Sequence, residues 1–280
     1  MPFGNYLTRA LGALGALALA LVAIAPPAAA QGDLLIAPTR VVMNGGSNAQ
    51  VILSNIGATP ATYRITLELR RMLPDGSLDD VAQTDANAAE AAALAMIRYA
   101  PRRITLEPGQ PQSVRITARP GAELLDGEYR VHMSFRAVPD ATPVAPTTAD
   151  PAPVTGLQIK LTPIYGITIP VIVRKGQLDA SATIASPQVL REGTGASLNL
   201  ALTRSGARSV YGEIRAIPRG AREPVFLVRG IAIYPELTAR TLSLPLSPEQ
   251  AAALKGPLRF EYREPDESGG KLIASLDATL

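Results

Sequence analysis

The sequence predicts an all-β protein built from two antiparallel β-sandwich domains. Three observations lead to this fold class. Short stretches in which apolar and polar residues alternate recur along the chain, and this two-residue period is typical of half-buried strands. Turn-forming residues separate the stretches, in keeping with 25 Pro and 23 Gly among 280 residues. No long helical period interrupts them, and many short strands joined by turns favour a sandwich.

The first thirty residues are predicted to be a signal peptide that is removed before Gln31. Arg9 is the only charged residue among them, an apolar run covers residues 10–25, and Ala occupies positions 28–30. This order of charge, apolar run and small residues is that of an export signal. An uncleaved membrane anchor is the alternative, but the run is short for a membrane span. We therefore expect an exported chain with no stable membrane insertion after cleavage.

Charge and composition argue against nucleic-acid binding. The chain has 27 basic and 24 acidic residues, and no basic patch with interleaved aromatic residues is evident. Such a patch is the footprint expected of a nucleic-acid-binding surface. Cys is absent. An exported protein can do without disulfides when each of its domains is large enough to bury a core.

Six strands are predicted before residue 139. They cover residues 34–43, 49–55, 61–70, 97–106, 113–118 and 127–138. In residues 61–70, Tyr63 and every second residue after it are apolar and the others are polar, which predicts one buried and one solvated face. Residues 85–96 are rich in Ala. We expect an irregular loop there, with a short surface helix as the alternative.

Residues 157–174 are the stretch around which the first domain is organised. Leu157, Ile159 and Leu161 alternate with polar residues, and the same period continues beyond them. Prolines within the stretch favour the edge of a sheet, because Pro has no N–H to donate. We expect residues 137–156, which are rich in Pro and Ala, to be a mobile connection. Both an ordinary half-buried strand and an assembly surface on an open edge fit this pattern.

The strand pattern restarts after residue 175 and predicts a second, smaller sandwich. The predicted domains are therefore residues 31–175 and 176–280. Ser247 has the side chain of an N-cap and precedes what could be one helical turn. The strands expected in this half cover residues 196–202, 210–217, 225–233, 241–246, 258–262 and 271–280.

The residues that most often carry enzyme or metal chemistry are nearly missing. His132 is the only histidine, so a His/Cys metal cluster cannot form. No nucleophile elbow, phosphate-binding loop or metalloprotease motif is present. We expect neither catalysis nor a bound cofactor or metal. His132 lies on the polar side of its predicted strand and is expected to be a solvated surface residue.

Arg40 is a charged residue among apolar neighbours in the first predicted strand. One interpretation is an outward-facing charge on a half-buried strand. The other is a partly sheltered guanidinium that binds a carboxylate through two parallel hydrogen bonds. The residues of this strand do not decide between the two.

Several motifs of the first domain together resemble those of the periplasmic pilus-assembly chaperones. Residues 36–45, Ile-Ala-Pro-Thr-Arg-Val-Val-Met-Asn-Gly, are similar to the first strand of that family, and Asn55 is similar to its strand-end Asn. Leu-Glu-Pro-Gly at 106–109 resembles a turn of the family, and residues 126–139 resemble the strand before its mobile loop. Leu-Gln-Ile-Lys-Leu at 157–161 resembles the strand that such chaperones lend to a pilin. The match covers residues 34–174 and is weak beyond them.

The resemblance implies a fold, a function and site residues. It implies two immunoglobulin-like sandwiches set at an angle with a cleft between them, in a periplasmic chaperone for fibre subunits. Arg40 would anchor the C-terminal carboxylate of the client. Leu157, Ile159 and Leu161 would form the donor strand, which complements the client by strand addition. The implied partners are fibre subunits and an outer-membrane usher.

The chain departs from the family at one position of the anchor. The family pairs its Arg with a Lys on the donor strand, and the aligned positions here are Gly166, Thr168 or Pro170. Lys160 lies several residues too early. The sequence therefore predicts a divergent chaperone with a different client. A secreted structural or adhesive protein that assembles through the same edge strand is the alternative function.

Overall fold

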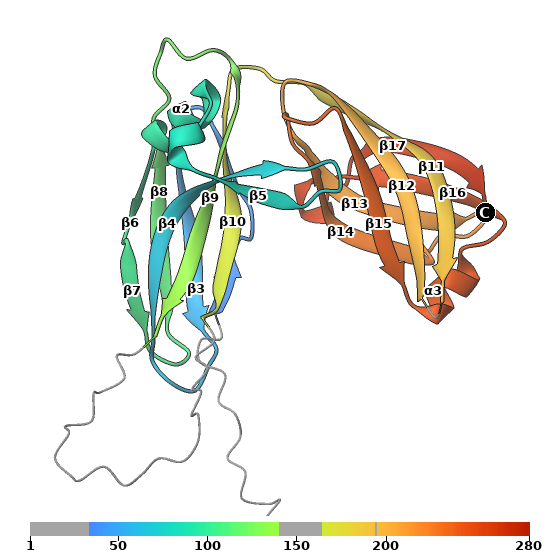
Figure 1. Cartoon of the computed structure of the whole chain (residues 1–280), viewed down its shortest axis with the longest axis horizontal. Coiled ribbons are helices and arrows are strands. Elements are labelled where there is room, and N and C mark those ends of the chain that lie inside the picture. The colour runs from blue at the N-terminus through green and yellow to red at the C-terminus, as the bar shows by residue number, and fades with distance from the viewer. Residues whose placement is uncertain (1–33, 140–163, 194) are drawn as a thin grey trace, which may run out of the picture.

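The computed structural model describes residues 34–139, 164–193 and 195–280. Figure 1 shows two β-sandwiches set at an angle, one from the first half of the chain and one from the second. The predicted all-β fold is confirmed, and each sandwich encloses a hydrophobic core of its own. No helix among the described residues is long and apolar enough to span a bilayer.

The first sandwich has two sheets that face each other across its core. One sheet has the strand order β1-β3-β8-β6, and the other has the order β2-β10-β9-β4-β5, with β7 also paired to β4. The alternation predicted for residues 61–70 is confirmed, because Tyr63, Ile65 and Leu69 are buried in this core. The strands are β1 (Leu34–Ala37), β2 (Val41–Asn44), β3 (Asn48–Asn55), β4 (Ala61–Met72), β5 (Leu78–Val81), β6 (Ile97–Ala100), β7 (Arg103–Leu106), β8 (Pro111–Ala118), β9 (Gly127–Val138) and β10 (Gly166–Lys175).

Two predicted strands are in fact pairs of shorter strands that belong to different sheets. Residues 34–43 contain β1, which pairs with β3, and β2, which pairs with β10. Residues 97–106 contain β6, which pairs with β8, and β7, which pairs with β4. Pro38 and Pro101 lie between the members of each pair. Proline cannot donate to a neighbouring strand, so pairing stops there and the chain crosses to the other sheet.

β10 contains the later part of the long stretch predicted as one strand. Its core face is confirmed, because Ile169, Val171 and Val173 are buried. β10 pairs antiparallel with β9 over its full length and parallel with β2 from Val171 to Arg174. The pairing of β10 with β2 is thus a parallel pair within the predicted antiparallel sandwich. The expectation of an edge strand was wrong from Val171 onward, because β2 covers that part.

Residues 88–96 form a helix where the sequence predicted an irregular loop. α2 (Ala88–Met96) follows a short 3-10 turn, η1 (Gln83–Asp85). Asn87 and Glu90 form a capping box, in which each side chain accepts a hydrogen bond from the backbone N–H of the other. This box satisfies two N–H groups at the start of the helix. Ala93 and Met96 then pack on the first core, which adds the tertiary contact that Ala-rich propensity alone did not reveal.

The second sandwich packs a three-stranded sheet, β11-β12-β15, against a four-stranded sheet, β14-β13-β16-β17. All six strands predicted in this half are present, and Ser247 caps α3 by accepting the N–H of Gln250. The sequence missed β11, whose buried face at its start is carried by the small Ala182 together with Ile184. The elements are β11 (Ala180–Glu192), β12 (Gly195–Gly206), β13 (Val210–Pro218), β14 (Phe226–Ile233), β15 (Ala239–Leu246), α3 (Pro248–Ala253), β16 (Pro257–Arg263), η2 (Asp266–Ser268) and β17 (Leu272–Thr279).

The β4–β5 hairpin reaches from the first sandwich to the second (Figure 1). At its turn, the backbone N–H of Thr241 donates to the carbonyl of Pro74 at 2.8 Å. Gly76 in the same turn has a φ of +89°, and a Cβ there would meet the guanidinium of Arg240. A third buried cluster combines side chains of both sandwiches: Met72, Ile172, Ala232 and Tyr234. These contacts set the position of one sandwich against the other.

Candidate functional site

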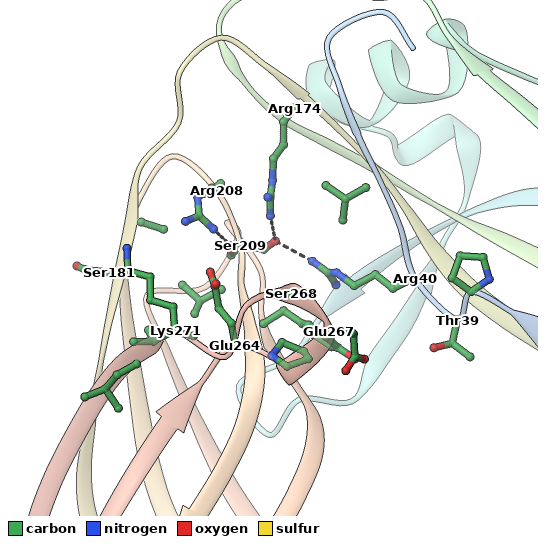
Figure 2. Close-up of a pocket in the computed structure, with 18 residues that line it drawn as sticks. Thr39, Arg40, Arg174, Ser181, Arg208, Ser209, Glu264, Glu267, Ser268 and Lys271 are labelled. Atoms are coloured by element: carbon green, nitrogen blue, oxygen red, sulfur yellow. Dashed lines mark hydrogen bonds between the residues drawn. The ribbon is translucent and has the colours of Figure 1, made fainter. Parts of the chain in front are cut away.

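A cavity of about 540 Å³ lies between the two sandwiches. Figure 2 shows that Arg40 and Arg174 reach it from the first sandwich, whereas Arg208, Ser209 and Lys271 line it from the second. Basic side chains therefore approach the same cavity from both sides. Guanidinium groups in such a place can bind a carboxylate through paired, charge-assisted hydrogen bonds.

Arg40 enters the cavity from the crossing between the two sheets. The sequence placed it within a strand, but it lies after β1 ends and one residue before β2 begins. Its Nη2 donates to Ser209 Oγ at 3.1 Å, and its Nη1 donates to the Tyr234 hydroxyl at 3.4 Å. Its Cζ lies 4.5 Å from the centre of the Tyr211 ring. The guanidinium is thus sheltered by the second sandwich, as the second interpretation of the sequence required.

A buried carboxylate connects the same serine to Arg174. The Glu128 side chain has no exposed surface, and Arg174 Nε donates to its Oε2 at 3.0 Å. Ser209 donates to this oxygen twice, through its Oγ at 2.9 Å and its backbone N–H at 3.1 Å. Because the Ser209 hydroxyl gives its proton to Glu128, its lone pairs face the arginines. Arg40 and Arg174 therefore converge on one oxygen atom that belongs to the second sandwich.

A second ion pair joins the sandwiches beside the cavity. Glu236, in the turn after β14, accepts hydrogen bonds from Arg130 of β9 at 2.5 and 3.1 Å and from the backbone N–H of Met72 at 2.9 Å. The Arg130 Cζ also lies 3.6 Å from the centre of the Tyr234 ring. Burial by itself would raise the pKa of Glu236, but these hydrogen bonds and the charge of Arg130 lower it overall. Glu236 is therefore held as an anion.

His132 is buried, so the expectation of a solvated surface residue was wrong. Only 2 % of it is exposed, and its ring meets that of Tyr234 edge to face with 6.5 Å between the ring centres. The alternation in β9 was identified correctly, because Val131, Met133 and Phe135 face the core. Near His132, however, the other face of β9 meets Tyr234 of the second sandwich instead of water, whereas Arg136 farther along this face is exposed. Polar residues on a strand therefore did not indicate solvent here.

We expect the stability of the protein to fall at acid pH because of His132. Burial, aided by the charges of Arg130, Arg70 and Arg40, lowers its pKa from 6.5 to about 3. Below pH 6.5 the unfolded chain binds a proton at His132 that the folded chain does not. The free energy of unfolding is therefore highest above pH 6.5 and decreases as the pH falls toward 3. Between pH 6.5 and 4.5 the loss should be about 2–3 kcal/mol.

Urea unfolding of the wild type and of His132→Gln at pH 7.5 and pH 4.5 tests this expectation. The amide of the variant does not titrate, so the variant should lose less stability than the wild type between the two pH values. Carboxylates titrate in both proteins and cancel in the comparison. An identical loss in both would show that His132 contributes nothing to the pH dependence.

The start of β10 is an open sheet edge beside an apolar cavity. Residues 166–170 pair with β9 on one side, and no described strand pairs with their other side. The Ile164 and Tyr165 side chains just before them are more than half exposed. The cavity has a volume of about 260 Å³ and is lined by Leu34, Ile56, Tyr63, Phe135, Tyr165, Gly166 and Ile167. An open edge with apolar surroundings is a place where another strand can be added.

The predicted site residues are only partly placed by the structure. Arg40 lies in the cleft, where the open part of the β10 edge ends, because β2 begins at Val41 and pairs with Val171. Leu157, Ile159 and Leu161 lie outside the described residues. The structure therefore places Arg40 beside the middle of β10, before the pairing of Val41 with Val171, and the donor residues themselves stay a prediction.

Sequence reasoning missed the residues that hold Arg40. Ser209 and Tyr211 belong to the second sandwich, where strands were identified but no site was. Glu128 and Arg174 are directly opposite each other on β9 and β10. Had the register of these two strands been known, opposite charges at facing positions would have indicated this pair. No local signal connects it to Ser209, because that contact forms only when the sandwiches meet.

Comparison with known proteins found likeness in structure alone. No protein-family model and no curated protein matches the sequence. The chain is similar to a chain of the CsuC–CsuE chaperone–tip subunit pre-assembly complex from Acinetobacter baumannii, with 13% identity, 87% of this chain and 97% of the other covered, and a TM-score of 0.45. It is similar to the E. coli chaperone DraB, with 14% identity, 89% and 97% covered, and a TM-score of 0.46. It is also similar to a chain of the Salmonella enterica SafA pilin–SafB chaperone complex, with 16% identity, 89% and 97% covered, and a TM-score of 0.44.

Proposed function

We propose that this protein is a periplasmic chaperone that binds fibre subunits by donor-strand complementation, prevents their aggregation and delivers them for assembly at an outer-membrane usher. A signal peptide over residues 1–30 would export it. Arg40 would anchor the C-terminal carboxylate of the subunit in the cleft. Leu157, Ile159 and Leu161 would fill the groove that the subunit's missing strand leaves open. The proposal includes no catalytic step, cofactor or metal.

One observation carries the proposal: Arg40 stands where an open sheet edge ends. β2 occupies the edge of β10 from the pairing of Val41 with Val171 onward, and residues 166–170 before that point are open on this side. A client strand added there would be collinear with β2 and would meet Arg40 where β2 begins. To bring its C-terminal carboxylate to Arg40, the client strand must run parallel to β10.

Two kinds of contact would hold the client. Three apolar side chains inserted into its groove contribute roughly 1.5–3 kcal/mol each when they are fully buried. A charge-assisted hydrogen bond from Arg40 to the terminal carboxylate contributes about 1.5–3 kcal/mol more. The first contact gives affinity for any groove of the right shape. The second sets the register, because only the last residue of the client carries the carboxylate.

The experiment that tests this function is the substitution Ile159→Asn. If Ile159 serves the client, the free protein should keep its melting temperature while the co-purifying fibre subunit is lost. The purified mature chain is melted, and the subunits that accompany a tagged chain from the periplasm are measured by mass spectrometry. A polar side chain in the client's groove costs the buried contact and leaves the amide without a partner.

Ile169→Asn is the matched control, because Ile169 is buried in the protein's own core with 1% exposed. It should destabilise the chaperone itself by several kcal/mol. If Ile159→Asn is destabilised in the same way and the client falls only in proportion, residues 157–161 are an ordinary strand of this protein. If the chain co-purifies only with further copies of itself, the structural or adhesive alternative is supported instead.

A further inference from the structure

We propose that the terminal carboxylate of the client is held by two guanidinium groups, Arg40 from the first sandwich and Arg208 from the second. This inference rests on the proposed function and names the second ligand of the same site. The second cation of the site would then come from the second sandwich, because β10 has no Lys at positions 166, 168 or 170. The argument starts from which charged groups at the cavity are still free to bind.

Arg174 is the nearest alternative, and it is already engaged. Its Nε donates to Glu128, whose side chain has no exposed surface. A buried ion pair that loses one partner leaves the other charge unpaired, which is strongly destabilising. Arg174 therefore neutralises Glu128 and cannot leave this pair to bind a client.

Ser209 cannot supply the second donor either. Its hydroxyl and its backbone N–H both donate to Glu128 Oε2. The hydroxyl has only one proton, so the Oγ presents lone pairs to the cavity. A client carboxylate therefore cannot take a hydrogen bond from Ser209, and its donors must be guanidinium groups on either side of this residue.

Arg208 lies on the other side of Ser209 from Arg40 (Figure 2). Its Nε donates to the carbonyl of Leu178 at 3.2 Å, and its Nη1 donates to the carbonyl of Ser209 at 3.4 Å. These neutral acceptors position the guanidinium without cancelling its charge. Within the described part of the chain, its Nη2 has no acceptor and the group has no ion-pair partner. Arg208 thus offers a positioned but uncommitted charge.

Lys271 also lines the cavity, but a carboxylate stands beside it. The N–H of Glu264 donates to the carbonyl of Lys271 at 2.9 Å, so the two residues face each other at the ends of β16 and β17. Glu264 lines the cavity, and Figure 2 shows it next to Lys271. Its carboxylate would repel that of a client there. The client's carboxylate is therefore expected at the Ser209 end, between Arg40 and Arg208.

The test uses the mature chain and a fluorescein-labelled peptide of alternating threonine and valine. The peptide is made with a free C-terminal carboxylate and, separately, as the C-terminal amide, and binding is followed by fluorescence anisotropy. The wild type should prefer the free acid about ten-fold or more, as expected for loss of a charge-assisted bond. Arg40→Gln and Arg208→Gln should each reduce this preference by a similar factor. Lys271→Gln, which removes the same charge from the same cavity, should change it less than two-fold.

The outcomes separate this inference from the proposed function. If Arg40→Gln removes the preference for the acid and Arg208→Gln behaves like Lys271→Gln, the inference is wrong and the anchor at Arg40 stands. If the wild type binds acid and amide equally, both fail. Arg208→Lys should restore part of the preference, because it keeps the charge but not the planar fork. A loss caused by misfolding would instead appear in the melting temperature and would weaken acid and amide binding alike.

Discussion

Glu128→Ala is expected to destabilise the first sandwich and its contact with the second by about 3–5 kcal/mol, the usual cost of breaking a buried ion pair. Three donors lose their acceptor: Arg174 Nε, the Ser209 hydroxyl and the Ser209 N–H. Arg174 is 21% exposed, so water can solvate only part of its charge. Urea unfolding followed by circular dichroism measures the loss. Two transitions instead of one would show that the sandwiches have become uncoupled.

Two comparisons make the Glu128 result specific. Glu192→Ala removes an exposed carboxylate at the end of β11 and should change the stability by less than about 0.5 kcal/mol. Glu128→Gln keeps the shape and one acceptor oxygen, so its loss should lie between those of the other two variants. A Glu128→Ala protein as stable as Glu192→Ala would contradict the role of Glu128 as the acceptor that joins β9, β10 and the second sandwich.

Glu236→Ala is expected to loosen the angle between the sandwiches. It leaves the Arg130 guanidinium, whose side chain is only 10% exposed, without its carboxylate, and it leaves the Met72 N–H without its acceptor. A cost of about 3 kcal/mol or more follows from the unpaired charge and the unsatisfied N–H. Small-angle X-ray scattering should show a wider spread of overall dimensions than in the wild type. Urea unfolding gives the energetic part.

A double-mutant cycle isolates the pair. Arg130→Met removes the charge that Glu236 compensates, so the double variant Arg130→Met with Glu236→Ala should lose less stability than the sum of the single variants. Purely additive losses would mean that Arg130 and Glu236 stabilise the protein independently. Unchanged scattering in Glu236→Ala would mean that the remaining contacts, among them the apolar cluster of Met72, Ile172, Ala232 and Tyr234, are enough to hold the sandwiches in place.

The local pattern of the sequence predicted most strands and one helix cap. Alternation of Tyr63 and Ile65 with polar residues identified β4, and Ser247 identified the start of α3. The local pattern failed to predict the structure of segments whose alternation or composition fits two different structures. A strand interrupted by Pro38 reads as one strand, although its two parts belong to different sheets. The Ala-rich segment lacked a visible helix signal until Asn87 and Glu90 were seen to cap it.

Of the residues around the cavity, the sequence predicted only Arg40 as a site residue, because residues 36–45 resemble the first strand of a known family. The surroundings of Arg40 come from positions far apart in the sequence: Glu128, Arg174, Ser209 and Tyr211. No motif contains two of these residues. The donor residues Leu157, Ile159 and Leu161 were predicted from the sequence alone and stay a prediction.

The sequence by itself determined the all-β fold class, the two-residue period of the strands and the unusual position of one arginine among apolar residues. These are properties of neighbouring residues, and backbone geometry translates them directly into strands and turns. Only the tertiary structure decided that His132 is buried, that β10 is an edge over half its length and that Arg40 meets Ser209. The physical reason is that burial and pairing depend on what covers a face. The residues that cover these faces are supplied by the second sandwich and by β2, which are distant in the chain.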